Sequence, residues 1–382
     1  MTEVLPERAK MFTHAPPIAP EAVVRIESWL LHSDVQLAEG AQRGAVAGWL
    51  SAGGEPDFVY LEITGYYLTA MAWLAAGAAS TRQNAEAALA QSQLATEWIG
   101  GLLSRHADPP TRLYLSGQPA DWRNDAVFSF DLAMAARGLS CAGDRSGRRT
   151  RRRALAGLGE RLNRISAGAD VMQSHATAPG APAPLPGRWS TRPGPHHLKA
   201  AAALLRGSDS ACGHALAAVA RRSCRHWRAV LGTDAWPCQE LHALFYGLEG
   251  MLILAGRDGD QLLLDDAESL YLRLMLLQAD DGTLPESIGG GVVRSDVLAQ
   301  ALRAGMLLRG RGRLAGEGWT ERIDALAGTL LEFVQPDGGV LFSRDQDISN
   351  TWCAMFAHQA LYLYSRGSAD PSAVDAAFEL LV

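Results

Sequence analysis

The sequence is poor in lysine, in aromatic residues and in cysteines that could pair, and it contains no long apolar run. Its five cysteines, Cys141, Cys212, Cys224, Cys238 and Cys353, include no Cys-x-x-Cys pair, which argues against both a disulfide framework and a zinc ribbon. The formal charge of −6 argues against a nucleic-acid-binding protein, whose surface is normally basic. The first residues lack the order of a signal peptide, and no apolar run of membrane-spanning length is free of polar residues. We therefore expect a cytoplasmic protein with reduced thiols, no membrane span and no nucleic-acid partner.

What the chain does contain is typical of a globular protein. With 48% hydrophobic and 20% charged residues, its 382 residues suffice for a large core. Residues 1–19 contain several prolines and are expected to form an N-terminal arm. Residues 20–382 are expected to form a single domain, and the sequence does not indicate an oligomeric state.

Helix patterns recur along this domain at a spacing of roughly 50–65 residues, close to the range in which internal repeats mark a repeated unit. Six strongly apolar helices are predicted at Phe58–Ala75, Asn124–Leu139, His196–Leu205, Glu240–Ala255, Arg294–Leu308 and Asn350–Tyr364. Surface-type helices alternate with them near Pro20–Ser33, Thr81–Arg105, Arg148–Ile165, Asp209–Val230, Asp258–Gln278, Trp319–Val334 and Pro371–Leu381.

This alternation predicts an all-α fold, a closed (α/α)6 toroid in which a ring of inner helices surrounds a central funnel. Strand-like stretches are short and confined to loops. We therefore expect small β-hairpins at one mouth of the funnel, for example within Gly282–Val293 and Asp337–Ser343.

Most of the inner helices carry polar side chains at positions i, i+4 and i+7, which lie on one face of a helix. The stripes are Glu62/Tyr66/Thr69, Asn124/Phe128/Asp131, His242/Tyr246/Glu249, Asp296/Gln300/Arg303 and Thr351/Met355/His358, while the third inner helix has only His196, His197 and Lys199 at its start. Polar groups on an apolar helix need partners or solvent. We expect the stripes to line one cavity; the alternative is that they form structural polar layers.

Carboxylates, imidazoles and phenols in one cavity are the groups that general acid–base catalysis uses. We predict catalytic roles for Glu62, Tyr66, His242, His358 and Asp296. Glu62 is the predicted base, with Tyr66 as a neighbouring donor. His242 or His358 is the predicted acid, because histidine titrates near neutrality.

The remaining candidates are predicted to bind the substrate: Trp122, Trp236 and Trp352 by stacking on a sugar face, and Asp131, His196, Tyr246, Glu249 and Arg303 by polar contacts. Arg303 suits a substrate carboxylate, which a guanidinium holds through two parallel hydrogen bonds. Loop aromatics such as these and Trp189 equally often plug the edge of a core. The proline-rich segment Ala176–Pro195 is expected to form an ordered loop or lid over the funnel.

Three features of the sequence resemble the six-hairpin (α/α)6 toroid superfamily. They are the alternating helices with polar inner stripes, the turns Gln278–Gly282 and Gln335–Gly339 at the ends of outer helices, and the segment Tyr60–Tyr66. The superfamily includes N-acylglucosamine 2-epimerase-like enzymes, glucuronyl C5-epimerase-like proteins, unsaturated glucuronyl hydrolases and terpenoid-cyclase toroids. The resemblance bears more on fold than on chemistry, because one fold hosts many functions.

Our leading hypothesis is a carbohydrate-active enzyme of epimerase, lyase or hydrolase type. Its partner would be a small-molecule or oligosaccharide substrate, such as a sugar or uronate, in polysaccharide or glycoconjugate biosynthesis. One alternative is a terpenoid cyclase. It fits less well because Leu284 and Val340 replace the tryptophan of the cyclase repeat, and because an aromatic content of 7% is low for stabilising carbocations. The other is a non-enzymatic toroid that binds a glycan or peptide.

Neither a metal nor a cofactor is predicted. Lanthionine-cyclase toroids hold zinc through two cysteines and a histidine. Cys238, Cys353 and His358 are present here, but without the local motifs of that site.

Overall fold

The structure is a computed structural model that describes residues 18–115, 122–143, 147–177, 185–206, 213–256, 259–366 and 370–382. Nearly all of the predicted N-terminal arm, part of the predicted lid segment and Cys212 lie outside these ranges. The described residues contain thirteen α-helices: α1 (Ile18–His32), α2 (Leu61–Trp73), α3 (Arg82–Arg105), α4 (Ser129–Cys141), α5 (Arg148–Ile165), α6 (His196–Arg206), α7 (His214–Leu231), α8 (Leu241–Ala255), α9 (Gln261–Met275), α10 (Ser295–Gly310), α11 (Trp319–Leu331), α12 (Thr351–Arg366) and α13 (Pro371–Glu379).

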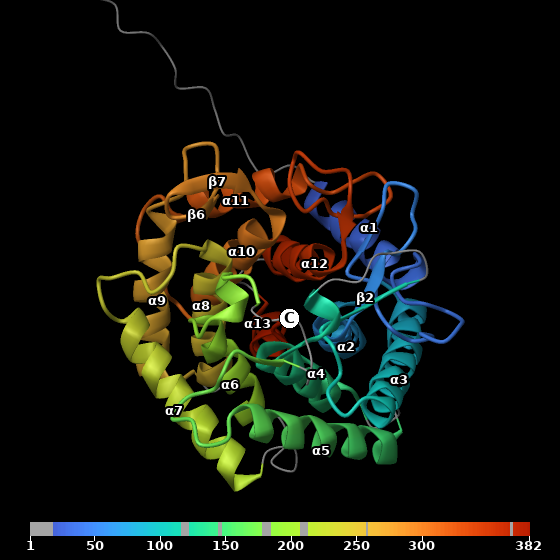
Figure 1. Ribbon diagram of the computed structural model, residues 1–382. Helices are drawn as coiled ribbons and strands as arrows, with labels where there is room; N and C mark the ends of the chain where they lie inside the picture. The colour runs from blue at the N-terminus through green and yellow to red at the C-terminus, as the bar shows by residue number, and fades with distance from the viewer. Residues whose placement is uncertain are drawn as a thin grey trace, which may run out of the picture.

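Six inner helices form a closed ring, and six outer helices surround it (Figure 1). Around the ring α2, α4, α6, α8, α10 and α12 pack each against the next, and α12 packs against α2. The outer helices α3, α5, α7, α9, α11 and α1 cover α2, α4, α6, α8, α10 and α12 respectively. The predicted all-α (α/α)6 toroid is therefore confirmed. Among the described helices none is both long and apolar enough to cross a membrane.

Helix α13 does not join the outer ring as an ordinary surface helix. It packs against α8, α10 and α12, and its residues Val374 and Phe378 are buried there. The chain then continues through residues 380–382, whose carbonyl groups accept hydrogen bonds from Arg137, Lys199 and Gln359 of the inner helices. This segment therefore fills the ring below the level at which the inner helices begin.

Short antiparallel strand pairs surround the mouth of the ring. They are β1 (Trp49–Leu50) with β8 (Ser349–Asn350), β2 (Phe58–Tyr60) with β3 (Arg112–Tyr114), β4 (Ala126–Phe128) with β5 (His175–Thr177), and β6 (Pro285–Ser287) with β7 (Gly290–Val293). The last pair is a hairpin inside the predicted segment Gly282–Val293, whereas Asp337–Ser343 makes only isolated bridges. Strands β2, β4 and β8 each lead directly into an inner helix, and β7 is separated from α10 by Arg294 alone, so the pairs hold these helix starts in place.

Helices α2 and α4 approach closely because each presents a glycine at their contact. A Cβ atom added to Gly138 would lie 2.2 Å from the carbonyl oxygen of Gly65 and 2.8 Å from Cβ of Leu68. A Cβ atom added to Gly65 would lie 2.6 Å from the backbone nitrogen of Ala135. Both collisions involve backbone atoms, which cannot rotate away as a side chain can.

Replacing Gly138 by alanine is therefore expected to lower the free energy of unfolding by about 1–3 kcal/mol, the usual cost of overpacking a core. The matched control is Gly328→Ala on the exposed face of α11, where an added Cβ would meet no atom within 4 Å. There alanine should raise stability by up to about 1 kcal/mol through its higher helix propensity. Denaturant unfolding of both variants tests this; equal effects at the two sites would contradict the close α2–α4 contact.

Candidate active site

A cavity of about 440 Å³ opens where the inner helices begin. Its lining is mixed: among the described residues it comprises nine aromatic, twelve polar or charged and two aliphatic side chains. They are Trp49, Tyr60, Glu62, Ile63, Thr111, Arg112, Trp122, Arg123, Phe128, Phe130, Asp131, Arg188, Trp189, Ser190, His196, His242, Tyr246, Arg294, Phe342, Gln346, Ile348, Asn350 and Trp352. The aromatic residues that are scarce in the whole sequence are thus concentrated here.

The structure brings seven of the predicted site residues together in this lining: Glu62, Trp122, Asp131, His196, His242, Tyr246 and Trp352. Six others do not line the cavity: Tyr66, Trp236, Glu249, Asp296, Arg303 and His358. The expectation that every polar stripe opens into the funnel therefore holds only in part, and the deepest stripe residues, Glu249, Arg303 and His358, do not reach the cavity.

Two carboxyl groups form a pair on one wall of the cavity. Glu62 is the second residue of α2 and Asp131 the third of α4, and their carboxyl groups lie close enough for each to shift the pKa of the other. The Thr111 hydroxyl donates a hydrogen bond to Asp131, and Tyr60 lies beside Glu62. Burial raises the pKa of both groups, and the charge of Glu62 raises the pKa of Asp131 further. Such a pair titrates as a unit, and it retains a shared proton above the usual carboxyl range.

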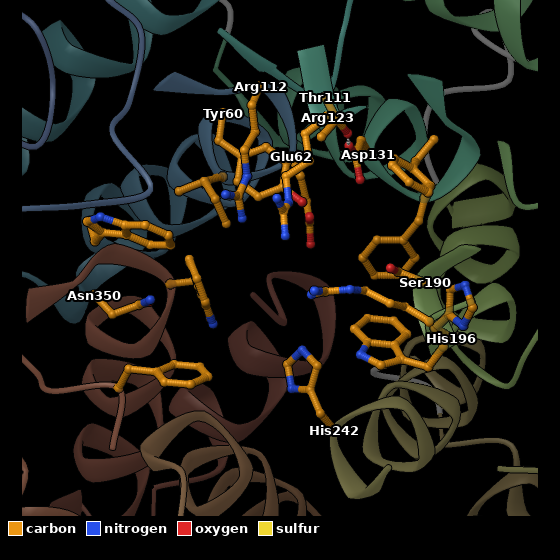
Figure 2. Close-up of a pocket in the computed structure, with 18 of the residues that line it drawn as sticks. Tyr60, Glu62, Thr111, Arg112, Arg123, Asp131, Ser190, His196, His242 and Asn350 are labelled. Atoms are coloured by element: carbon orange, nitrogen blue, oxygen red, sulfur yellow. Dashed lines mark hydrogen bonds between the residues drawn. The ribbon is translucent and has the colours of Figure 1, made fainter. Parts of the chain in front are cut away.

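His242 stands on the opposite wall (Figure 2). Its Nδ1 lies 2.8 Å from Oε1 of Gln300, a carbonyl oxygen that can only accept, so Nδ1 carries the proton. Burial lowers the pKa of His242 to about 4, although the nearby Asp296 opposes this shift. At neutral pH His242 is therefore uncharged, with the lone pair on Nε2.

Asp296 supports the wall around His242 without reaching the cavity surface. The Arg294 guanidinium donates two hydrogen bonds to it, at 2.6 and 3.1 Å, and Nε1 of Trp352 donates a third at 3.2 Å. Its Oδ2 also lies 3.4 Å from Nδ1 of His242. Burial alone would raise the pKa of Asp296, but the charge of Arg294 outweighs it and lowers this pKa to about 2. Asp296 is therefore a fixed anion that orients cavity residues.

A buried ionic cluster lies below the cavity. Lys199 Nζ is 2.7 Å from Oε2 of Glu249, and Arg303 Nε donates to Oε1 of the same carboxylate at 2.9 Å. All three side chains are fully buried. Lys199 also lies 4.7 Å from the ring centre of Tyr66 and 4.6 Å from that of Tyr246. Arg303 was predicted to bind a substrate carboxylate, but its guanidinium is already paired with Glu249.

The other predicted residues also have internal surroundings. Tyr66 packs edge-on against Phe356, and its buried hydroxyl lies beside Tyr246. His358 stacks on Tyr362 in the core, with burial lowering its pKa to about 4. Trp236 lies under the guanidinium of Arg273, away from the cavity.

Sequence reasoning missed several of the residues that loops and strands contribute to the cavity. These are chiefly Trp49, Arg112, Arg123, Arg188 and Arg294. Their positions in the sequence could have indicated them, because Arg294 directly precedes an inner helix and Arg123 and Arg188 lie within eight residues of one. Trp189, noted as a loop aromatic, packs against His196, His242 and Tyr246.

The surroundings favour a different assignment of acid and base from the one that the sequence indicated. Glu62 was expected to be the base and His242 the acid. In the structure the pKa values of the two carboxyl groups are raised, whereas the pKa of His242 is lowered to about 4. The pair is therefore suited to donate a proton and His242 to accept one.

Within the described residues, no group of three or more histidine, cysteine or acidic side chains is placed to hold a metal ion.

Comparison with known proteins gives similarity of fold without similarity of sequence. No family model matches the chain, and no curated protein matches it. A sugar epimerase from a ruminal bacterium shares 14% identity at a TM-score of 0.67, covering 90% of this chain and 99% of the epimerase. A D-mannose isomerase shares 12% identity at a TM-score of 0.67, covering 92% and 100%. A type II terpene cyclase from Scytonema shares 14% identity at a TM-score of 0.55, covering 91% and 99%.

These similarities show that the chain has the (α/α)6 toroid fold that the sequence predicted. Structures with this fold include sugar epimerases, an isomerase and a terpene cyclase. The chemistry of this chain has to be argued from its own cavity.

Proposed function

We propose that the protein is a carbohydrate-active enzyme that moves a proton to and from a carbon atom of a saccharide, as an epimerase, isomerase or lyase does. The observation that carries this proposal is the Glu62/Asp131 pair, with its raised pKa values, facing His242, with its lowered pKa, across one cavity. A group that donates a proton and a group that accepts one, on opposite walls, can act on opposite faces of one substrate.

The lining supports a saccharide as the substrate. The lining combines groups that form hydrogen bonds with the indole rings of Trp49, Trp122, Trp189 and Trp352. Aromatic faces cover the apolar faces of a sugar ring, and polar groups meet its hydroxyls, because such sites combine apolar area with a few placed polar groups. The sugar epimerase and D-mannose isomerase of the same fold support this choice.

Two other functions fit the cavity less well. Hydrolysis of a glycosidic bond between two carboxyl groups needs them at least about 5 Å apart. Glu62 and Asp131 instead lie close enough for each to shift the pKa of the other. Terpenoid cyclisation passes through carbocations, which the four arginines in the lining would destabilise by charge repulsion.

The test is to incubate the protein with neutral sugars, uronates and sugar phosphates in D2O and to follow their carbon-bound protons by NMR. The proposal predicts, for at least one saccharide, exchange of a carbon-bound proton or a new epimer, isomer or unsaturated product. His242→Asn should abolish the reaction. A panel without any change, or activity that does not depend on His242, would contradict the proposal.

The assignment of acid and base predicts the pH profile of kcat/KM. His242 must be uncharged to accept a proton, so activity should fall as the pH decreases through about 4. The carboxyl pair must hold its proton, so activity should also fall at high pH, on a limb above the usual range of a carboxyl pKa because the pair is raised. A profile that instead rises with protonation of a group near pH 6–7 would restore histidine as the acid, since its unperturbed pKa lies there.

Trp122 and Trp236 provide a matched pair for testing the aromatic contacts. Trp122 lines the cavity, whereas Trp236 packs under Arg273 outside it. Trp122→Ala is expected to weaken binding of the saccharide by about 0.5–1.5 kcal/mol, the scale of one aromatic contact. Trp236→Ala should leave binding unchanged. Calorimetric titration of both variants checks this; equal losses would show that the effect is transmitted through stability.

A further inference from the structure

The charge of the cavity differs in sign from that of the chain. The chain has a formal charge of −6, yet the described lining contains four arginines and only two acidic side chains. Arg294 is neutralised internally, because it donates to Asp296 and lies 3.1 Å from a carboxylate oxygen of Glu286. Arg112 and Arg188 add positive charge to the cavity.

Arg112 is surrounded by aromatic rings on the cavity wall. Its guanidinium lies over three aromatic rings, at 4.1 Å from the centre of Phe58, 5.2 Å from Tyr60 and 5.3 Å from Trp49. Its Nε is buried without a hydrogen-bond partner among the described residues. The aromatic rings hold the cation and remove part of its water. A guanidinium fixed in this way on a cavity wall is prepared to bind an anion.

The surroundings of Arg112 add to the positive potential. Arg188 is exposed at the rim of the same cavity. The inner helices begin at this level, and the starts of helices carry partial positive charge. Figure 2 shows Arg112 and Glu62 on the same wall. A bound anion would therefore lie next to the Glu62/Asp131 pair.

We propose that the substrate is an anionic saccharide, whose carboxylate or phosphate group is bound by Arg112 with help from Arg188. This inference rests on the proposed function and narrows its substrate class. Arg112 takes the role that sequence analysis gave to Arg303, which is buried against Glu249. Positive charge in a cavity of an acidic protein also draws an anionic ligand selectively to that cavity.

Calorimetric titration with D-glucuronate, D-glucose 6-phosphate and D-glucose tests this. At least one charged sugar should bind about tenfold more tightly than glucose, as expected for a charge-assisted hydrogen bond. The preferred probe identifies the anionic group as carboxylate or phosphate. Arg112→Gln should abolish the preference, and Arg188→Gln, on an exposed side chain, should reduce it without affecting folding. The control Arg82→Gln alters a 92% exposed side chain on α3 and should retain the preference.

The outcomes separate this inference from the proposed function. Glucose binding as tightly as both charged sugars, or an unchanged preference in both Arg112→Gln and Arg188→Gln, would overturn the anionic substrate and leave a neutral saccharide. Binding of no saccharide at all would count against both proposals.

Discussion

Replacing Asp131 by asparagine is expected to lower turnover of the saccharide by a factor of about 10²–10⁴, the usual contribution of one acid–base group. Asparagine has the same shape and can still accept the hydrogen bond from Thr111. It cannot hold the proton that Asp131 shares with Glu62. The fold and the affinity for the saccharide should therefore remain close to those of the parent protein, while kcat falls.

The partner substitution tests whether the two carboxyl groups act as a unit. Glu62→Gln should cause a loss of similar size. The double variant should be little worse than either single one, because groups that act together are strongly non-additive. Asp108→Asn, at a surface ion pair with Arg164, is the control and should keep full turnover. Losses that multiply in the double variant would show that Glu62 and Asp131 act independently.

Replacing Glu249 by glutamine is expected to lower the free energy of unfolding by about 3–5 kcal/mol, the cost of breaking a buried ion pair. The substitution leaves Lys199 and Arg303 fully buried without their shared counter-charge. The charges of Arg303 and Lys199 outweigh burial and lower the pKa of Glu249, which shows that the folded state favours the carboxylate.

The control is Glu86→Gln, which removes an exposed partner of Arg82 on α3. A surface pair of this kind contributes about 0–1 kcal/mol. Denaturant unfolding of both variants measures the difference. Similar losses at Glu249 and Glu86 would contradict the buried cluster.

The sequence allowed the ring of helices to be predicted because each inner helix is apolar around most of its circumference and each outer helix only on one face. It also allowed Glu62, Asp131 and His242 to be predicted as cavity residues. All three lie in the first turn of their helices, where the cavity is.

The polar stripes could not show how far along its helix each residue lies from the cavity. Positions i and i+7 share a face but lie about 10 Å apart along the axis. Glu249 lies seven residues below His242 on α8, and His358 lies six residues below Trp352 on α12, at a level where the ring is filled by Lys199, by aromatic side chains and by residues 380–382. Where side chains fill the ring, the polar residues of a stripe pair with other residues of the protein, as Glu249 pairs with Arg303.

The arginines of the cavity could not be placed from periodicity. Arg112 comes from strand β3, and Arg188 precedes a short turn of 3-10 helix at Trp189–Thr191. Residues in such segments reach the cavity through tertiary pairing, here β2 with β3, which a helical period does not encode.

The shared proton of Glu62 and Asp131 is the central claim, and infrared spectroscopy of the protein without substrate at pH 7 tests it most directly. A protonated carboxyl group gives a C=O stretching band separate from that of carboxylates. The difference spectrum between the parent and Asp131→Asn is predicted to show one buried protonated carboxyl that only the parent contains, with Asp108→Asn showing no such difference. A parent spectrum in which Glu62 and Asp131 contribute only carboxylate bands would contradict the account.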